Sequence, residues 1–453
     1  MKEVDLIVVG GTIVTMDAAR TIIFNGALAI EGSKIVAMGT SAEITAAYKG
    51  RKLINAKGHY IFPGLINSHT HLFQTLLKGL AADTPLQTWI ARLITPVVPL
   101  LSEEDCYYAA QLGILEAIRS GTTTLLDFMY LTCHPEFSEA VITAAQTTGI
   151  RLLFGRGVHD TGVNRGVPPQ LIEDVDTVLT EVDYLRRQYE LKSDGMIHIW
   201  LAPSVMWGMS YSGLRSLAAY ATENKVPITM HLMETDYDID LCQADYGKRP
   251  LEILAEMGML ANHFLLVHGV QAEESDLQLM DAYRVSWSHC MAANLYLGSG
   301  VAPITRASPA TAVSLATDGA ASNNSQNMIE LLKLTALVHK GVYRNPGIIN
   351  ASRIIAMATC EGARAVGMEK QIGTLAPGYR ADLFIVNPGL PTTTPVHDPL
   401  ATLVYSCDQE NIETVIINGK IVMHCRHLLT INEEEVVNKV QDIARRLRDK
   451  LNI

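Results

Sequence analysis

The sequence predicts an α/β fold: a (β/α)8 TIM barrel with a small β-sandwich module formed by the N- and C-terminal segments. Between residues 59 and 370, short apolar strands alternate with segments of helical periodicity, and eight such strands can be counted. On either side of this stretch, short strands are joined by turns. We therefore expect a barrel over 59–370, a β-module built from 1–58 and 371–430, and a C-terminal helix over 431–453.

The N-terminal part of the predicted module contains four short apolar runs separated by turn residues. They are Leu6–Val9, Thr12–Thr15, Ala27–Ile30 and Lys34–Ala37. The pair Gly10-Gly11 lies between the first two runs. It is not a nucleotide-binding loop, because it lacks the G-x-G-x-x-G pattern and no helix follows it.

The predicted barrel strands are eight apolar runs with helical segments between most of them. In chain order they are Tyr60–Ile66, Thr122–Asp127, Arg151–Gly155, Ile197–Ala202, Pro227–His231, Phe264–His268, Arg284–Ser288 and Ala312–Asp318. One of the helical segments is Glu103–Arg119, which has an apolar face and is followed by Gly121.

The C-terminal part of the predicted module contains two further strands and precedes a helix. Apolar runs lie at Ala381–Val386 and Val415–Val422, and the second contains Asn418-Gly419, a tight-hairpin signal. The last helix is expected to begin near Asn432, an N-cap residue with Glu435 three positions further on.

Composition and charge exclude several classes of protein. The 453 residues are 48% hydrophobic and carry a net charge of −11, which argues against a nucleic-acid or anionic-membrane partner. No apolar stretch approaches the roughly 18 residues that cross a bilayer, and the N-terminus does not resemble a secretory signal. The seven cysteines are scattered without a Cys-x-x-Cys pair, so we expect reduced thiols and a cytoplasmic protein.

The pair His69 and His71 is the most informative motif. Residues i and i+2 of a strand point the same way, so both imidazoles can reach one ion. His231, His268 and Asp318 stand at the ends of three other predicted strands. Each residue alone has a structural alternative, as a core histidine or a turn aspartate. Together, at the strand ends where barrel enzymes build their sites, they predict a divalent-metal site with an open position for water.

Most of the other histidines are expected to be structural or on the surface. These are His134, His159, His198, His263, His339, His397, His424 and His427. His289, just past the seventh strand, is expected to line the pocket instead. The acids Asp236, Asp238 and Asp240 are expected to be solvated loop residues.

Several segments resemble the amidohydrolase superfamily, most closely its chlorohydrolase and methylthioadenosine/S-adenosylhomocysteine deaminase group. The first is PGLINSHTH at 63–71, and the similarity covers nearly the whole chain. The others are HLMET at 231–235, SH at 288–289, NLYLGSGVAP at 294–303, TDGAASNN at 317–324, ATCEGARA at 358–365 and GYRAD at 378–382.

The resemblance implies roles for individual residues. It makes His69, His71, His231 and Asp318 the ligands of one metal ion, and it makes Glu234, His268 and Asp318 catalytic. The expected ion is Zn²⁺, with Fe²⁺ as the alternative that the same ligands suit. Binuclear members use a lysine at the end of the fourth strand, which this chain lacks, so one ion is expected. The resemblance also implies a homodimer or homotetramer.

The expected reaction is the hydrolytic deamination of an amino-substituted nitrogen heterocycle. A divalent ion can lower the pKa of bound water from 15.7 to roughly 7. Asp318 would hold this water and take its proton, and Glu234 would carry a proton to a ring nitrogen. His268 would hydrogen-bond the attacking oxygen as negative charge develops on it.

Candidate substrate-binding residues follow the strand ends, and their tryptophans and methionines suit a flat apolar ring. They are Phe73, Gln74, Trp89, Met129, Arg156, Trp207, Met209, His289, Asn294 and Ser322. Arg156 resembles a family arginine near the substrate tail. Val98 stands where adenosine-type deaminases have a glutamate that binds ribose hydroxyls.

The missing glutamate favours a base-like substrate: a triazine, an aminopyrimidine, a pterin or an oxopurine. The segment 288–294 also departs from the group, which usually has proline and serine there. Two other enzymes stay open, an s-triazine chlorohydrolase or alkylaminohydrolase and a methylthioadenosine/S-adenosylhomocysteine deaminase. A non-catalytic barrel scaffold is a remote alternative, because no expected metal ligand is missing.

Overall fold

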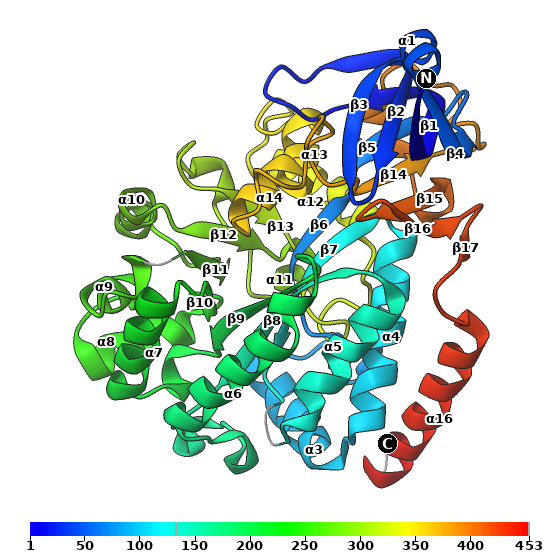
Figure 1. Cartoon of the computed structure of the whole chain (residues 1–453). Coiled ribbons are helices and arrows are strands. Elements are labelled where there is room, and N and C mark those ends of the chain that lie inside the picture. Colours follow the sequence, from blue (N-terminus) through cyan, green and yellow to red (C-terminus); the bar gives the residue numbers. More distant parts are fainter. Residues whose placement is uncertain (132–133, 262, 452–453) are drawn as a thin grey trace.

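The computed structural model describes residues 1–131, 134–261 and 263–451. Its strands form two sheets, one of eight parallel strands and one of nine strands from the two terminal parts of the chain (Figure 1). The predicted barrel with a terminal β-module is therefore confirmed. Among the described residues, no helix combines the length and apolarity that a membrane crossing requires.

The eight barrel strands pair in parallel and in chain order. They are β6 (Leu65–Thr70), β7 (Thr122–Met129), β8 (Arg151–Val158), β9 (Ile197–Pro203), β10 (Ile228–Leu232), β11 (Phe264–His268), β12 (Ser286–His289) and β13 (Val313–Leu315). The two ends of this path, β6 and β13, meet through the N–H of Asp318, which donates to the carbonyl of His69 at 3.1 Å. The Oγ of Ser68 also donates to the carbonyl of Leu315 at 3.1 Å. The strand end that carries His69 and His71 therefore lies against the segment that carries Asp318.

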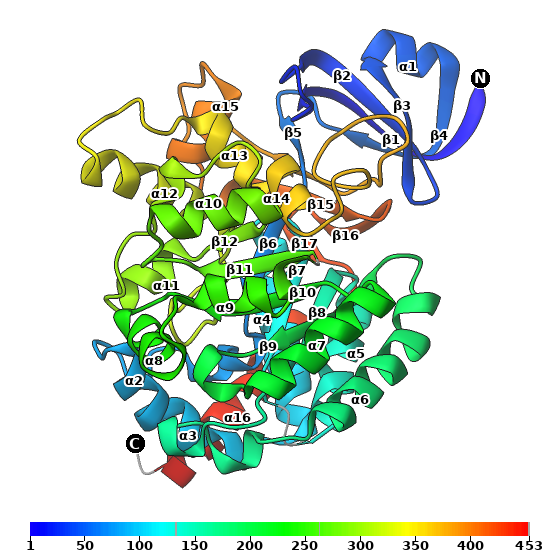
Figure 2. The same ribbon diagram turned by 90° about the vertical axis from the view of Figure 1, so that its left-hand side faces the viewer.

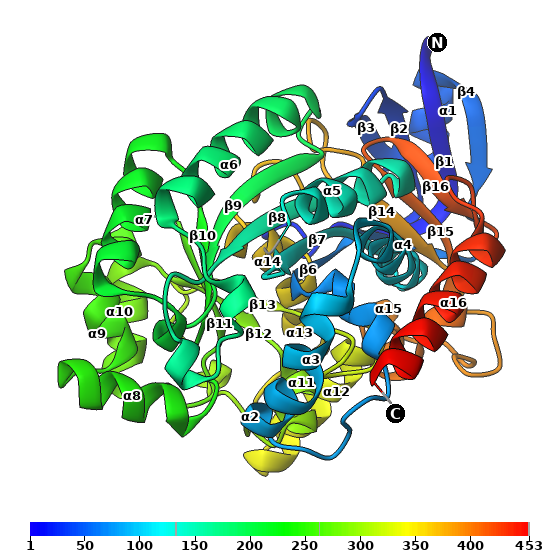
Figure 3. The ribbon, with the colours of Figure 1, turned by 90° about the horizontal axis from the view of Figure 1, so that it is seen from below.

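Helices lie outside the barrel strands, as the view from below shows (Figure 3). The longer helices are α4 (Glu103–Arg119), α5 (Glu136–Thr148), α6 (Val175–Gln188), α7 (Tyr211–Asn224), α8 (Asp236–Tyr246), α10 (Glu274–Tyr283), α12 (Met328–Val342) and α16 (Glu433–Leu451). The shorter ones are α1 (Ser41–Ala47), α2 (Leu86–Trp89), α3 (Thr95–Val97), α9 (Pro250–Glu256), α11 (Met291–Tyr296), α13 (Ala351–Ala358), α14 (Cys360–Ala365) and α15 (Pro399–Ala401). α4 begins with a capping box between Ser102 and Asp105, which explains its sharp start.

The first predicted barrel strand, Tyr60–Ile66, is wrong, because the chain changes sheet within it. Tyr60–Pro63 forms β5 of the terminal sheet, and β6 begins at Leu65. Gly64 between them allows a close crossing, since a Cβ there would lie 2.0 Å from the Oγ1 of Thr123. The terminal module therefore extends to Pro63.

The terminal sheet joins strands from both ends of the chain. Its members are β1 (Lys2–Val14), β2 (Ile22–Glu31), β3 (Lys34–Thr40), β4 (Tyr48–Asn55), β5 (Tyr60–Pro63), β14 (Leu383–Val386), β15 (Ile412–Ile417), β16 (Lys420–His424) and β17 (His427–Leu428). β1 runs through Gly10 as one strand with an irregular register, so the predicted turn there is wrong. Asn418 and Gly419, both with positive φ, form the predicted hairpin between β15 and β16.

A buried ion pair ties this sheet to the barrel. Arg151 at the start of β8 and Asp382 just before β14 are 2.9 Å apart, and neither side chain is exposed above 1%. The side chain of Asp382 also accepts from the N–H of Asn418 at 2.6 Å. The sheet lies at one end of the barrel (Figure 2), so the pair is placed away from the strand ends that carry the predicted ligands.

The C-terminal helix packs on the barrel rather than on the terminal sheet. The N–H of Glu435 donates to the side chain of Asn432 at 3.3 Å, as the predicted N-cap requires. Arg446 on α16 forms an ion pair with the buried Asp105 of α4 at 2.5 Å. The helix therefore covers part of the outer layer beside α4 (Figure 1).

Replacing Asp382 with Asn should destabilise the protein, because it leaves the buried Arg151 without its counter-charge. Breaking one side of a buried pair costs about 3–5 kcal/mol of unfolding free energy. Urea unfolding measures the change. The matched control is Asp5→Asn, which removes an exposed pair with Arg51 and should cost under about 1 kcal/mol. Equal effects of the two substitutions would contradict the assigned role of the buried pair.

Candidate active site

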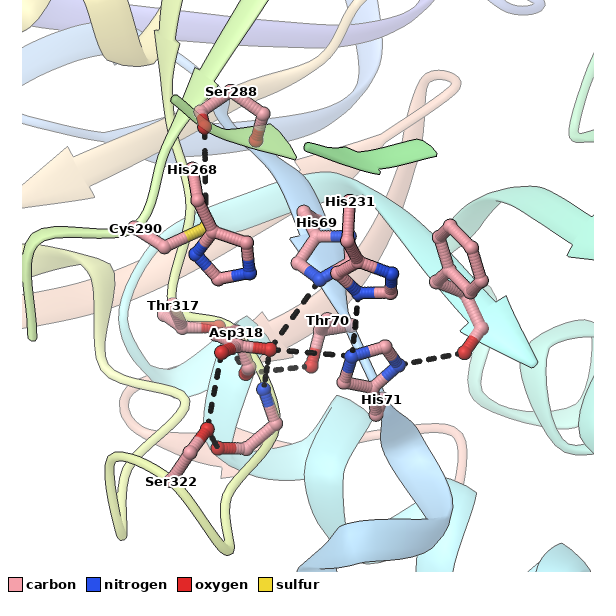
Figure 4. Close-up of polar contacts among 12 residues, drawn as sticks. His69, Thr70, His71, His231, His268, Ser288, Cys290, Thr317, Asp318 and Ser322 are labelled. Carbon is pink, nitrogen blue, oxygen red and sulfur yellow. Dashed lines mark hydrogen bonds and ion pairs between the residues drawn. The ribbon is translucent and has the colours of Figure 1, made fainter. Parts of the chain in front are cut away.

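Four side chains from three parts of the barrel converge at the C-terminal ends of its strands (Figure 4). The Nε2 atoms of His69 and His71 each lie 3.3 Å from the Oδ1 of Asp318. The Nε2 of His231, on β10, lies 3.3 Å from the Nε2 of His71. The sequence-predicted ligands are therefore brought together around one point.

The hydrogen bonds behind two of these imidazoles determine what they present to that point. The Nδ1 of His71 lies 2.7 Å from the carbonyl of Phe128, and the Nδ1 of His231 lies 2.8 Å from the carbonyl of Ser204. Because a carbonyl only accepts, both Nδ1 atoms carry a proton, and a neutral ring then keeps a lone pair on Nε2. Burial and the nearby His69 hold the pKa of His231 well below its usual range, so this ring is neutral. The Nε2 of His231 therefore presents a lone pair, and the Nε2 of His71, 3.3 Å away, is placed to bind the same cation.

His69 and Asp318 complete a donor set with the chemistry of a metal site. Burial lowers the pKa of His69 to about 3, and neither of its ring nitrogens has a hydrogen-bond partner among the described residues. Burial alone would raise the pKa of Asp318, but its contacts with His69 and His71 hold that pKa well below the usual range. Neutral imidazoles and one carboxylate are the ligands that zinc and similar divalent ions take in hydrolases.

Backbone and side-chain hydrogen bonds hold Asp318 in place. Its Oδ1 accepts from the N–H of Gly319 at 2.6 Å, and its Oδ2 accepts from Ser322 at 3.1 Å (Figure 4). Its carbonyl accepts from Thr70 and from Gln326, both at 3.0 Å. These contacts fix the carboxylate before any ligand binds, which reduces the reorganisation that binding requires.

Positive φ angles occur at the same strand ends. Asp318 has a φ of 62°, His268 a φ of 70° and Met233 a φ of 53°. Non-glycine residues adopt this region rarely, and it carries strain that surrounding contacts must offset. The three strained residues lie at the ends of β10, β11 and β13, where the side chains converge on the site.

Glu234 and His268 lie beside the predicted ligands and form an acid–base pair. The Nε2 of His268 is 3.6 Å from the Oε2 of Glu234, whose Oε1 accepts from Ser299 at 3.1 Å. The Nδ1 of His268 is 2.8 Å from the Oδ1 of Asn294, so Nδ1 donates and Nε2 faces the site. Burial raises the pKa of Glu234. Burial opposes a charge on His268, yet Glu234 and Asp318 raise its pKa.

One cavity joins these groups to a mostly apolar wall. His71, His231, Glu234, His268 and Asp318 line its polar end. Four of the predicted substrate-binding residues also line it, namely Gln74, Trp89, Trp207 and Ser322. The apolar wall consists of Leu86, Ile90, Ile94, Val167, Pro168, Leu171, Val205 and Leu297.

The other predicted substrate-binding residues do not line this cavity. Arg156 is buried and binds Glu173 at 2.8 Å and Glu181 at 2.7 Å, so its guanidinium is occupied by two carboxylates. Asn294 orients His268, and His289 pairs with His339 at 3.3 Å. Phe73, Met129 and Met209 are likewise buried outside the lining.

Sequence patterns missed four polar residues of the cavity, Tyr130, His159, Ser204 and Asp238. The expectation of a solvated Asp238 is wrong: it is 3% exposed, and its Oδ2 accepts from the N–H of Glu234 at 3.2 Å. A start of α8 at Asp236 would have signalled this contact, since acids in the first turn of a helix accept backbone N–H groups. His159 directly follows β8, and this position at a strand end is the feature that could have assigned it to the cavity.

The barrel, the donor set and the acid–base pair define a metal-dependent hydrolase. Residues 60–422 match the Amidohydrolase family, so the chain belongs to this family. A curated relative is the 5-methylthioadenosine/S-adenosylhomocysteine deaminase 1 of Syntrophus aciditrophicus (strain SB). It is 34% identical over 454 residues, covering 100% of this chain and 99% of that protein.

Solved structures give the same fold over the whole chain. An adenosine deaminase from Xanthomonas campestris with bound zinc has a TM-score of 0.91 and 26% identity, covering 100% of this chain and 99% of that chain. A triazine hydrolase from Arthrobacter aurescens has a TM-score of 0.91 and 25% identity, covering 97% and 99%. The likeness to the zinc-bound structure supports a divalent metal in the His/Asp cluster.

Replacing His231 with Ala should remove most of the bound metal, since it deletes one of the converging donors. Substitution of a residue that only hydrogen-bonds a metal ligand already lowers metal affinity by about 10- to 100-fold, so loss of a ligand should cost at least as much. Elemental analysis after dialysis measures the ion content per chain. The control is His159→Ala, which removes a cavity imidazole outside the donor set and should leave the ion content unchanged. Full metal content in the His231 variant would contradict the ligand assignment.

Proposed function

We propose that this enzyme is a mononuclear aminohydrolase that replaces the amino group of a nitrogen heterocycle with oxygen and releases ammonia. His69, His71, His231 and Asp318 would hold one divalent ion, Zn²⁺ in the first instance. The observation that carries the proposal is the approach of two imidazole Nε2 atoms, 3.3 Å apart, beside the carboxylate of Asp318, whose pKa is held well below its usual range. The absence of a lysine from β9 supports a single ion.

The chain supplies a route for both protons of the attacking water. A divalent ion in this donor set would lower the pKa of water to roughly 7. Glu234 would take one proton from the water and pass it to the ring nitrogen beside the reacting carbon, and burial raises the pKa of Glu234, which favours holding this proton. Asp318 passes the other to the amino group. The carbon gains a C–O bond and loses its C–N bond, and the nitrogen leaves as ammonia.

His268 stabilises the attacking oxygen in this scheme. Its Nδ1–H donates to Asn294, and its Nε2 faces the site. Because Glu234 and Asp318 raise the pKa of His268, the ring would take a second proton on Nε2 and donate it to the reacting oxygen. A preorganised donor of this kind is worth about 10²–10³ in rate when it meets developing negative charge. His268 is therefore proposed as a catalytic residue that binds the reacting oxygen and not the ion.

The cavity favours a base-like ring over a nucleoside with a charged tail. None of the described residues that line it is Arg or Lys, so an anionic tail would find no cation there. Val98, at the position of the ribose-binding glutamate, is 1% exposed and lies outside the lining. A triazine, an aminopyrimidine, a pterin or an oxopurine suits an apolar lining that includes Trp89 and Trp207.

Two features of the biology stay predictions. The family resemblance favours a homodimer or a homotetramer, which sedimentation analysis would measure. The reduced cysteines and the acidic balance favour a cytoplasmic protein that binds neither nucleic acid nor membrane.

A substrate panel tests the reaction class directly. The purified protein is assayed for ammonia with purines, nucleosides, pterins, pyrimidines and triazines, before and after chelation of its metal. Ammonia release from a free ring, lost on chelation and restored by Zn²⁺, is expected. Release of chloride or an alkylamine from s-triazines, without ammonia from any ring, would identify the alternative triazine hydrolase and overturn the deaminase.

Replacing Glu234 with Gln should lower kcat by about 10²–10⁴-fold, because the proton carrier is lost. Its metal content should stay unchanged, since Glu234 is not among the proposed ligands. The matched control is Asp240→Asn, which changes an exposed acid of the neighbouring α8 and should leave kcat intact. Normal turnover by the Glu234 variant would eliminate its assigned role.

A further inference from the structure

Tyr130 stands at the polar end of the cavity, immediately after β7. Its ring meets the imidazole of His71 edge-on, with centroids 4.8 Å apart and planes at 77°. It also meets the ring of Phe73 edge-on, at 5.0 Å and 89°. Two perpendicular contacts, one of them with a proposed metal ligand, fix the plane of the tyrosine ring. The hydroxyl group therefore has a defined position beside the reaction centre.

The neighbouring Gln74 determines which way this hydroxyl group can bond. The Nε2 of Gln74 lies 2.9 Å from the hydroxyl oxygen of Tyr130 and can only donate. Gln74 keeps this orientation because its Oε1 faces the N–H of Ala321 at 3.4 Å. The amide also packs directly on Gly319, where a Cβ would lie 1.9 Å from that Oε1. Tyr130 is thus the acceptor in the contact with Gln74, and its own proton points elsewhere.

The hydroxyl proton of Tyr130 is available to a ligand. A phenol keeps its proton at neutral pH. Within residues 1–131, 134–261 and 263–451, no side chain or carbonyl accepts that proton. Gln74 lines the same cavity and keeps a second Nε2–H beyond the one given to Tyr130. The two N–H bonds of an amide diverge by about 120°, so this second N–H and the Tyr130 hydroxyl would meet different acceptor atoms of a ligand.

A ring carbonyl oxygen matches the Tyr130 hydroxyl better than a ring nitrogen does, because the carbonyl oxygen has two lone pairs and the ring nitrogen has one. We propose that Tyr130 is a specificity-determining residue that donates a hydrogen bond to a ring carbonyl, so the substrates are amino-oxo heterocycles. This inference rests on the proposed deaminase and narrows its substrate class. Rings with an amino group but no carbonyl leave the Tyr130 hydroxyl unpaired, and such rings are disfavoured.

Matched ring pairs test the inference. Guanine with 2-aminopurine, and 2-amino-4-pyrimidinone with 2-aminopyrimidine, each differ by the carbonyl and its tautomeric proton. Tyr130→Phe should lower kcat/KM on the oxo ring by roughly 3- to 10-fold, the usual worth of one neutral hydrogen bond. On the ring without the carbonyl it should lower kcat/KM by less than about twofold. Each effect compares the variant with the wild type on the same ring, so the intrinsic reactivity of that ring cancels.

The control variant is Tyr184→Phe, which removes a hydroxyl on the surface helix α6 that bonds to Glu139 at 3.1 Å. This variant should leave the kcat/KM of the oxo ring relative to its partner unchanged in both ring pairs. An equal loss on both members of a pair in the Tyr130 variant would overturn the inference, since the hydroxyl would then not recognise the carbonyl.

A binding measurement separates this inference from the reaction itself. In the Glu234→Gln background, calorimetry gives the dissociation constant of each ring without turnover. Adding Tyr130→Phe should weaken binding of the oxo ring by the same factor and leave its partner unchanged. If the wild-type enzyme released no ammonia from any ring, the proposed deaminase would fail, while these constants would still decide the role of Tyr130. The role of Tyr130 would be overturned if neither ring bound, or if the oxo ring bound equally well to the Glu234→Gln variant with and without Tyr130→Phe.

Discussion

The site depends on the seam at which the barrel closes. The N–H of Asp318 donates to the carbonyl of His69, so the last strand segment is attached to the first beside the two histidines. Asn67 strengthens the seam, since its side chain bonds both the backbone N–H and the hydroxyl of Thr317, at 3.1 and 2.7 Å. A residue from the far end of the barrel sequence thereby faces one from its start. Without this closure, the carboxylate and the imidazoles would not share one point.

In the proposed reaction, two pairs of cavity residues would have different tasks. The segments after β10 and β11 supply Glu234 and His268, whose protonation is adjusted by burial and by each other's charge. Tyr130 and Gln74 supply neutral donors. Proton transfer requires groups that change charge, whereas recognition of a ring requires groups that keep theirs. The apolar residues of the lining would pack against the faces of the proposed ring.

The sequence predicted most of the donor set, because strand ends and period-2 spacing are local signals. His69 and His71 are two residues apart, and His231, His268 and Asp318 each follow an apolar run. The break at Gly64 was not predictable, since the apolar run continues through it and only the approach of Thr123 reveals the change of sheet. Arg156 was assigned to the substrate because Glu173 and Glu181, which bind it, lie 17 and 25 residues further along the chain. Tyr130 gave no local signal, because its role depends on Gln74, 56 residues earlier.

Anomalous diffraction at the zinc edge, from crystals of the metal-loaded enzyme, tests the central claim most directly. The account predicts one anomalous peak per chain, within bonding distance of His69, His71, His231 and Asp318, with His268 outside that distance. Two peaks, or a single peak elsewhere in the barrel, would contradict the mononuclear site and the chemistry built on it.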